Sequence, residues 1–288
     1  MTILRFAVRV GYAPLLLLGF NGVAIGLMAQ SRSPGLLLPL LLGAIGVSFA
    51  AEALVPYLPA WNRSHGDAGR DVLHAVVNEV SNGVSIAATP VLAGLVALRG
   101  AWPQGWPFWV QVVGALLVLD AGITLAHWAS HRWQVLWRFH AVHHSVERMY
   151  GLNGLMKHPL HQAVEMVAGA TPLVLLGMPS AVGWTIGFCT AIQLLLQHSN
   201  VDYALGPLTR WIAGNRVHRF HHLRWPGEGD VNFGLFTTLW DRLLGTARFD
   251  AARRIGSVDL GIADRSSYPR AYGAQLLEPF RGADRIAA

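Results

Sequence analysis

The 288-residue chain is 53% hydrophobic and only 13% charged, whereas a typical soluble domain is about 25% charged. This composition predicts an integral membrane protein. The formal net charge is +6, but the basic residues are scattered along the chain rather than gathered in one stripe, which argues against a nucleic-acid partner. Cys189 is the only cysteine, so zinc ribbons, iron–sulfur clusters and disulfides within the chain are excluded.

Three pairs of apolar segments follow one another along the chain, and we interpret each pair as a helical hairpin. A membrane-spanning helix needs about 20 apolar residues, a length that the first two pairs provide. The first half of the third pair is shorter, so we expect that hairpin to be tilted or only half inserted. The pairs are 11–30 with 35–58, 80–98 with 107–126, and 164–177 with 180–197.

The basic residues predict which side of the membrane the rest of the chain occupies. Each hairpin returns to the side on which it began, so all the segments between hairpins share one side. Of the 22 basic residues, only Arg32 and Arg99 lie in the opposite loops. Because cytoplasmic loops carry an excess of Lys and Arg, we expect the shared side, including both termini, to be cytoplasmic.

Histidines on that shared side form three tight clusters. In H-x3-H, both histidines lie on one face of a helix and can reach one metal ion. In H-x-x-H-H, the last two diverge by about 100° around a helix, so one cluster can serve two adjacent ions. Neutral imidazole suits iron, copper, zinc and nickel, and so many histidines indicate two metals. The candidate ligands are the eight clustered histidines, together with His198, which lies between the last two clusters. The eight are His127, His131, His140, His143, His144, His218, His221 and His222.

Asp120 interrupts an apolar segment and falls on the same helical face as Thr124, His127 and His131. A carboxylate at membrane depth is costly and usually faces a partner or a cavity. Histidines that bind a metal often donate their second ring N–H to a carboxylate. We therefore expect Asp120 to accept such a hydrogen bond; the alternative is a carboxylate at a helix end that reaches solvent.

The run LDAGITLAHWASHRWQVLWRFHAVHHS (119–145) resembles the fatty acid hydroxylase/sterol desaturase superfamily of integral membrane enzymes. Residues 196–246 are even more similar, through Asn232-Phe233-Gly234 and the ending Trp240-Asp241-Arg242 … Gly245-Thr246. The resemblance covers roughly residues 115 to 250. Its several elements in one order make it specific.

This resemblance implies that the nine histidines bind two iron ions, and that the protein uses O₂ to hydroxylate or desaturate a C–H bond of a lipid. No G-x-G-x-x-G fingerprint opens a helix after a strand, so we expect electrons to come from a separate ferredoxin-like or small haem protein. His158 is expected to support the ligands or lie at an entrance, and His161 to be a boundary histidine. Many relatives have a second histidine where this chain has Gln197.

Asp241 or Arg242 is expected to fix the C-terminal segment against the loop that carries residues 218–222. The overall expectation is an all-α integral membrane protein with a cytosolic, histidine-rich helical cap. Its regions are membrane hairpins (1–126), a catalytic region with the third apolar hairpin (127–250, hairpin 164–197) and a C-terminal cytosolic tail (251–288). The alternative is a metal-binding membrane protein without oxygenase activity, a transporter or a hydrolase. The sequence does not identify the lipid.

Overall fold

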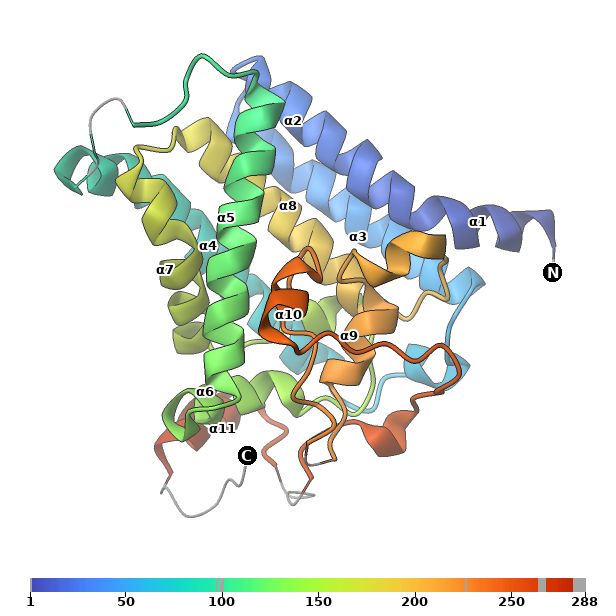
Figure 1. Cartoon of the computed structure of the whole chain (residues 1–288). Helices are drawn as coiled ribbons and strands as arrows, with labels where there is room; N and C mark the ends of the chain where they lie inside the picture. Colours follow the sequence, from blue (N-terminus) through green and yellow to red (C-terminus); the bar gives the residue numbers. More distant parts are fainter. Residues whose placement is uncertain (1, 97, 99–100, 226, 264–267, 282–288) are drawn as a thin grey trace.

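The computed structural model describes residues 2–96, 98, 101–225, 227–263 and 268–281, and this part of the chain consists of helices joined by loops (Figure 1). Within it, the only β-pairings are isolated bridges, such as Pro56 with Val201. The all-α expectation is therefore confirmed. Arg99, one of the two basic residues expected in the opposite loops, lies outside the described residues.

Five helices are long and apolar enough to cross a membrane: Ile3–Ala29, Pro34–Leu54, Ala68–Val96, Phe108–Ser130 and Ser180–His198. Many of their apolar side chains face outward, as lipid contact requires; Leu95 of the third helix, for example, is 78% exposed. The first of them is continuous through α1 (Ile3–Pro14), a π-helical stretch η1 (Leu15–Phe20) and α2 (Asn21–Ala29). Pro14, which has no backbone N–H to donate within a helix, ends α1, and the π-helical stretch begins directly after it.

The second span consists of a short 3₁₀ turn, η2 (Pro34–Leu36), and α3 (Leu37–Leu54). The next helix, α4 (Ala68–Val96), begins twelve residues before the expected start at residue 80. The sequence did not predict this extension, because the first half of α4 is polar. Its side chains Asp71, His74 and Asn78 are buried against loops that lie far along the chain. The side-chain amide of Asn78, for instance, donates to the carbonyls of Leu155 and Lys157.

The helix α5 (Phe108–Ser130) packs closely against α7 (Pro159–Leu175). Glycines allow this approach: a Cβ added to Gly122 would lie 2.2 Å from the carbonyl oxygen of Ala168, and one added to Gly169 would lie 2.7 Å from Leu119 Cδ1. At 17 residues, α7 is not among the five candidate spans. The last span, α8 (Ser180–His198), is mostly buried and contacts α2, α3, α4 and α5.

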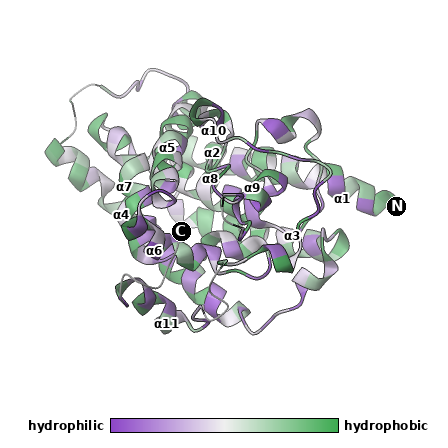
Figure 2. Cartoon of the chain, turned by 60° about the horizontal axis from the view of Figure 1, so that its bottom comes forward, coloured by the Kyte–Doolittle hydropathy of each residue, from purple (hydrophilic) through white to green (hydrophobic). Residues whose placement is uncertain are grey.

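The remaining helices are short and lie together at one end of the bundle, where Figure 1 shows α6, α9 and α11. Hydrophilic residues gather around this cap in Figure 2. The segment after residue 250 packs onto the cap, since Leu260 and Gln275 are buried and Gln275 hydrogen-bonds His74 at 2.9 Å. The short elements are η3 (Pro59–Asn62), α6 (Gln134–His144), η4 (Gly151–Leu155), η5 (Gly206–Arg210), α9 (Asn215–His221), α10 (Leu239–Leu244), η6 (Ser257–Asp259), α11 (Tyr272–Leu277) and η7 (Glu278–Phe280).

Candidate metal centre

Nine buried histidines from α5, α6, α8 and α9 and the residues at their ends converge in two adjacent groups. Within each group, one ring nitrogen of every histidine lies within 4.8 Å of the others. These are the nine histidines that the sequence analysis selected. The first group is His127, His131, His140, His144 and His221, and the second is His143, His198, His218 and His222.

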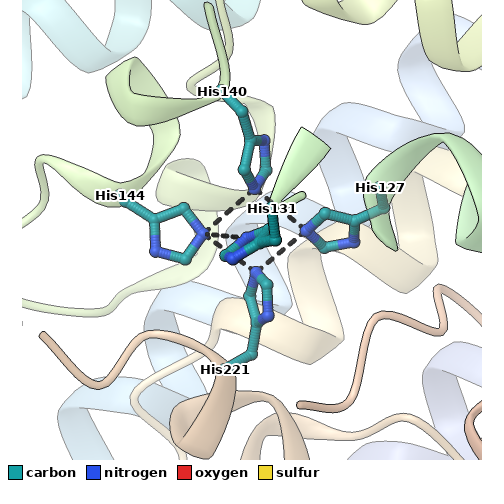
Figure 3. A group of neighbouring side chains, drawn as sticks. All are labelled: His127, His131, His140, His144 and His221. Atoms are coloured by element: carbon teal, nitrogen blue, oxygen red, sulfur yellow. Dashed lines mark hydrogen bonds between the residues drawn. The ribbon is translucent and has the colours of Figure 1, made fainter. Parts of the chain in front are cut away.

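In the first group, the Nε2 atoms point toward one another (Figure 3). His127 Nε2 lies 3.0 Å from that of His140 and 2.8 Å from that of His221, and His144 Nε2 lies 3.0 Å and 2.9 Å from the same two atoms. Donors bound at right angles, about 2.1 Å from one ion, are about 3.0 Å apart. The spacing of these nitrogens therefore fits a shared metal ion.

In the second group, the Nε2 atoms are similarly close to one another. His198 Nε2 lies 3.3 Å from the Nε2 atoms of His143 and His222 and 3.0 Å from that of His218. The two groups adjoin where the rings of His144 and His222 stack at a centroid distance of 4.8 Å. The last two histidines of each H-x-x-H-H run fall in different groups, as their angular separation on a helix predicts.

The outward-facing Nδ1 atoms show which ring nitrogen carries the proton. Five of them contact an oxygen that can only accept, so the proton sits on Nδ1 and the Nε2 lone pair faces inward. A hydrogen bond cannot then explain why the Nε2 atoms of His127 and His221 approach to 2.8 Å, or those of His143 and His198 to 3.3 Å. The Nδ1 acceptors are the carbonyls of Phe233 (His127, 2.8 Å), Met156 (His143, 3.0 Å), Leu194 (His198, 3.1 Å) and Val231 (His221, 3.0 Å), and the Asp230 carboxylate (His131, 3.0 Å).

Electrostatics also favour neutral, metal-binding imidazoles. Burial lowers the pKa of His140, His144 and His221 well below 6.5, and the neighbouring imidazoles lower it further. The same causes lower the pKa of His143 and His218. These rings are therefore neutral at physiological pH, which is the form that binds a metal.

Asp120 is buried, but the expectation that it accepts a hydrogen bond from an imidazole is wrong. Its carboxylate accepts from the backbone N–H groups of residues 235–237 and from the Thr237 hydroxyl, at 2.8 to 3.1 Å. That loop also contains Phe233, whose carbonyl accepts from His127. Asp120 thus supports His127 through the loop, because the Nδ1 of His127 contacts the Phe233 carbonyl rather than the carboxylate.

Asp241, like Asp120, binds backbone N–H groups of this loop. It is fully buried, and its two carboxylate oxygens accept from the backbone N–H groups of Phe233 and Gly234 at 2.7 and 2.8 Å. It therefore holds the 232–234 segment rather than residues 218–222 directly. Arg242 points elsewhere, with its guanidinium 4.2 Å from the Trp211 ring centroid. The side-chain amide of Gln197 also serves this loop, since it donates to the Gly234 carbonyl at 3.0 Å.

The expected role of His158 in supporting the ligands is wrong. Its Nδ1 accepts from the Leu160 backbone N–H, which caps the start of α7, and its Nε2 contacts the Leu276 carbonyl. His161, expected at a boundary, instead lies inside, with its ring 4.4 Å from that of His140 and its Nε2 2.9 Å from Ser130 Oγ.

Sequence reasoning also missed Asp230, the carboxylate that contacts His131 Nδ1. It is half-exposed in a loop rich in glycine, and no periodic pattern connects it with the histidines. A small cavity of about 60 Å³ beside it is lined by His131, His144 and His221, so small molecules have a route from the cap surface to the first group.

Comparisons with known proteins agree with the site. A family model described as fatty acid hydroxylase matches residues 112–246. The ornithine lipid hydroxylase of Rhizobium tropici is 36% identical over 250 residues, which are 83% of this chain and 74% of that protein. The alkylglycerol monooxygenase of Danio rerio is 32% identical over 50% of this chain and 31% of its own length. Methylsterol monooxygenase 1 of Gallus gallus is 27% identical over 50% of this chain and 48% of its own length. No solved structure matches the chain.

Proposed function

The chain belongs to the fatty acid hydroxylase/sterol desaturase superfamily, and on that premise we propose that it oxidises a C–H bond of a membrane lipid at a centre of two iron ions, using O₂. The observation that carries this proposal is the convergence of nine inward-facing Nε2 atoms into two adjacent groups. Bound iron would activate O₂ for this oxidation, and an external donor would provide the pair of electrons that the reaction needs.

The protein's own residues perform three tasks in this proposal. The buried imidazoles stay neutral and direct their Nε2 lone pairs inward. The carbonyls of Phe233 and Val231 fix the ring orientation of His127 and His221. The small cavity at His131 and His144 admits O₂ while the surrounding cap excludes bulk water from the second group.

An apolar cavity of about 370 Å³ between α4, α7 and α8 supports a lipid as the substrate. It is lined by side chains such as Ile86, Met166 and Ile186, and it lies within the membrane-spanning part of the bundle. We propose hydroxylation rather than desaturation, because the relatives are named as a hydroxylase and monooxygenases. The first substrate to test is an ornithine-containing lipid, by similarity to the relative with 36% identity.

We further propose that the cap faces the cytoplasm and receives electrons from a separate ferredoxin-like or small haem protein. The distribution of basic residues supports this orientation, because only Arg32 and Arg99 fall in the loops of the opposite side.

The test compares variants from each histidine group with a histidine outside them. His143→Ala and His221→Ala should each lower bound iron and abolish oxidation, whereas His65→Ala, at an exposed loop position, should match the wild type. Iron per chain is measured by elemental mass spectrometry. Lipid products are measured by mass spectrometry of cells with and without the gene, where one added oxygen indicates hydroxylation and a lost pair of hydrogens indicates desaturation. Full activity in either cluster variant would contradict the proposal.

A further inference from the structure

A polar pocket of about 180 Å³ lies on the face of α9 that points away from the histidine groups. Its walls come from distant parts of the chain: the first helix, the segment before η3, α9, and the loop after α10. Arginine dominates the charged lining, with five arginines against two aspartates. These are Arg9, Arg216, Arg219, Arg253 and Arg254, with Asp202 and Asp250.

Arg219 is the unusual member, because it is a cation that is only 3% exposed. Its guanidinium carbon lies 3.7 Å from the centroid of the Tyr57 ring, and one terminal nitrogen donates to the Ser199 carbonyl at 3.3 Å. Its Nε is buried and has no hydrogen-bond partner among the described residues. None of the described carboxylates forms an ion pair with it. Asp202 and Glu52 act on it only from beyond ion-pair distance. A buried cation without a direct partner is costly, so this pocket favours an anion.

Of the two lining aspartates, Asp202 is engaged by other arginines, and Asp250 accepts from the Ala252 backbone N–H at 2.8 Å. Asp202 is shared by Arg9 at 3.1 Å and Arg216 at 2.8 Å. Arg253 pairs with Glu228 at 2.7 Å. Exposed Arg254 contacts no carboxylate within ion-pair distance in the described part of the chain and sits over the same Tyr57 ring as Arg219, at 5.7 Å.

We propose that this pocket binds a phosphoryl anion, with Arg219 and Arg254 as its principal donors. The planar guanidinium fork matches phosphate oxygens, and such charge-assisted hydrogen bonds are among the strongest in proteins. Arg9 belongs to a helix whose outward Leu4 and Phe6 are exposed and apolar, so the pocket lies where that helix meets the polar cap. The phosphoryl group is therefore that of a lipid headgroup or a free phosphate ion.

An anion in this pocket would stabilise the helix that carries two of the candidate ligands, without contacting those ligands. Arg219 stands between His218 and His221 on α9, a helix of only seven residues. An anion that holds Arg219 also holds this helix against the Tyr57 segment. Binding should therefore raise the thermal stability of the whole cap, whatever reaction the histidines support.

The test uses the full-length purified protein and needs no turnover. Cys189 is the only cysteine and is 1% exposed, so a thiol-reactive dye reports unfolding. Melting is followed in a maltoside detergent free of phosphate, in the same detergent with added phosphatidylglycerol, and in that detergent with inorganic phosphate or chloride at equal ionic strength. Arg254→Gln, an exposed and fold-safe change, is compared with Arg270→Gln, which removes the same charge from a side chain that is 70% exposed outside the pocket.

We expect at least one phosphoryl source to raise the melting temperature of the wild type and of Arg270→Gln. Arg254→Gln should need about tenfold or more of that source for the same shift, because one charge-assisted bond is lost. A response to phosphatidylglycerol alone identifies a lipid headgroup, and a response to inorganic phosphate identifies a free ion. If neither source stabilises the wild type, or if both variants respond alike, the proposal is overturned.

Discussion

Replacement of Asp120 by Asn tests whether a carboxylate in a membrane-spanning helix supports the metal site through the returning loop. The wild-type carboxylate accepts four hydrogen bonds, two on each oxygen. Asparagine retains one oxygen, so two of these bonds persist in weaker, uncharged form. Its amide NH₂ then faces the Thr237 backbone N–H, which is left partly buried without an acceptor.

The magnitude follows from these changes. Bonds to a charged group contribute about 1.5–3 kcal/mol and neutral ones about 0.5–1.5, while an unsatisfied buried donor costs about 1–3 kcal/mol. We therefore expect Asp120→Asn to destabilise the protein by about 3–5 kcal/mol. Because Phe233 in the same loop orients His127, bound iron and turnover should fall as well.

The assay follows labelling of Cys189 on heating, together with iron content after a fixed exposure to chelator. Thr237→Val is the graded control. It removes the hydroxyl bond to Asp120 and an exposed bond from the Leu239 N–H, but keeps the three backbone bonds to Asp120, so it should lose less stability. An Asp120→Asn protein with wild-type melting and wild-type iron retention would refute the argument that this charge holds the loop.

Three further predictions concern helix packing, the carboxylate at the cluster, and pH. Gly122→Ala should destabilise the protein by about 1–3 kcal/mol, because its Cβ would overlap the Ala168 carbonyl; Gly114→Ala on the same helix meets no neighbour within 4 Å and should melt like the wild type. Asp230→Asn should weaken iron binding by about 10-fold or more, measured by chelator competition, because His131 loses a charged acceptor; unchanged affinity would make Asp230 incidental. Since burial depresses the pKa of the cluster imidazoles below 6.5, the unfolded chain takes up protons first on acidification. Stability should thus be fully present above pH 6.5 and fall below it, and a melting temperature constant from pH 7.5 to 5.5 would contradict this.

The sequence predicted the parts of the site that depend on local helix geometry. The spacing of His140, His143 and His144 determines their directions around α6 wherever that helix lies. Apolar segment lengths likewise predicted most of the membrane helices, since such segments are buried or meet lipid regardless of topology.

The parts that sequence did not predict depend on contacts between distant segments. Asp120 shares a helical face with His127, but its partners arrive 115 to 117 residues later in the chain. Asp230 gives no periodic signal because it lies in a loop. The start of α4 was missed because the polar side chain of Asn78 is satisfied only by the loop at residues 155–157.

Both α6 and α9 contribute histidines to each of the two groups. The direction in which these histidines point around each helix therefore determines both centres at once. One inserted residue turns everything after it by about 100°, so an insertion in the middle of α6 would disturb both groups at once. A change of length in the loop before η4 leaves those directions unchanged. In evolution or design, a loop that contacts no ligand can therefore change length, whereas an insertion within α6 or α9 cannot alter one centre and leave its neighbour unchanged.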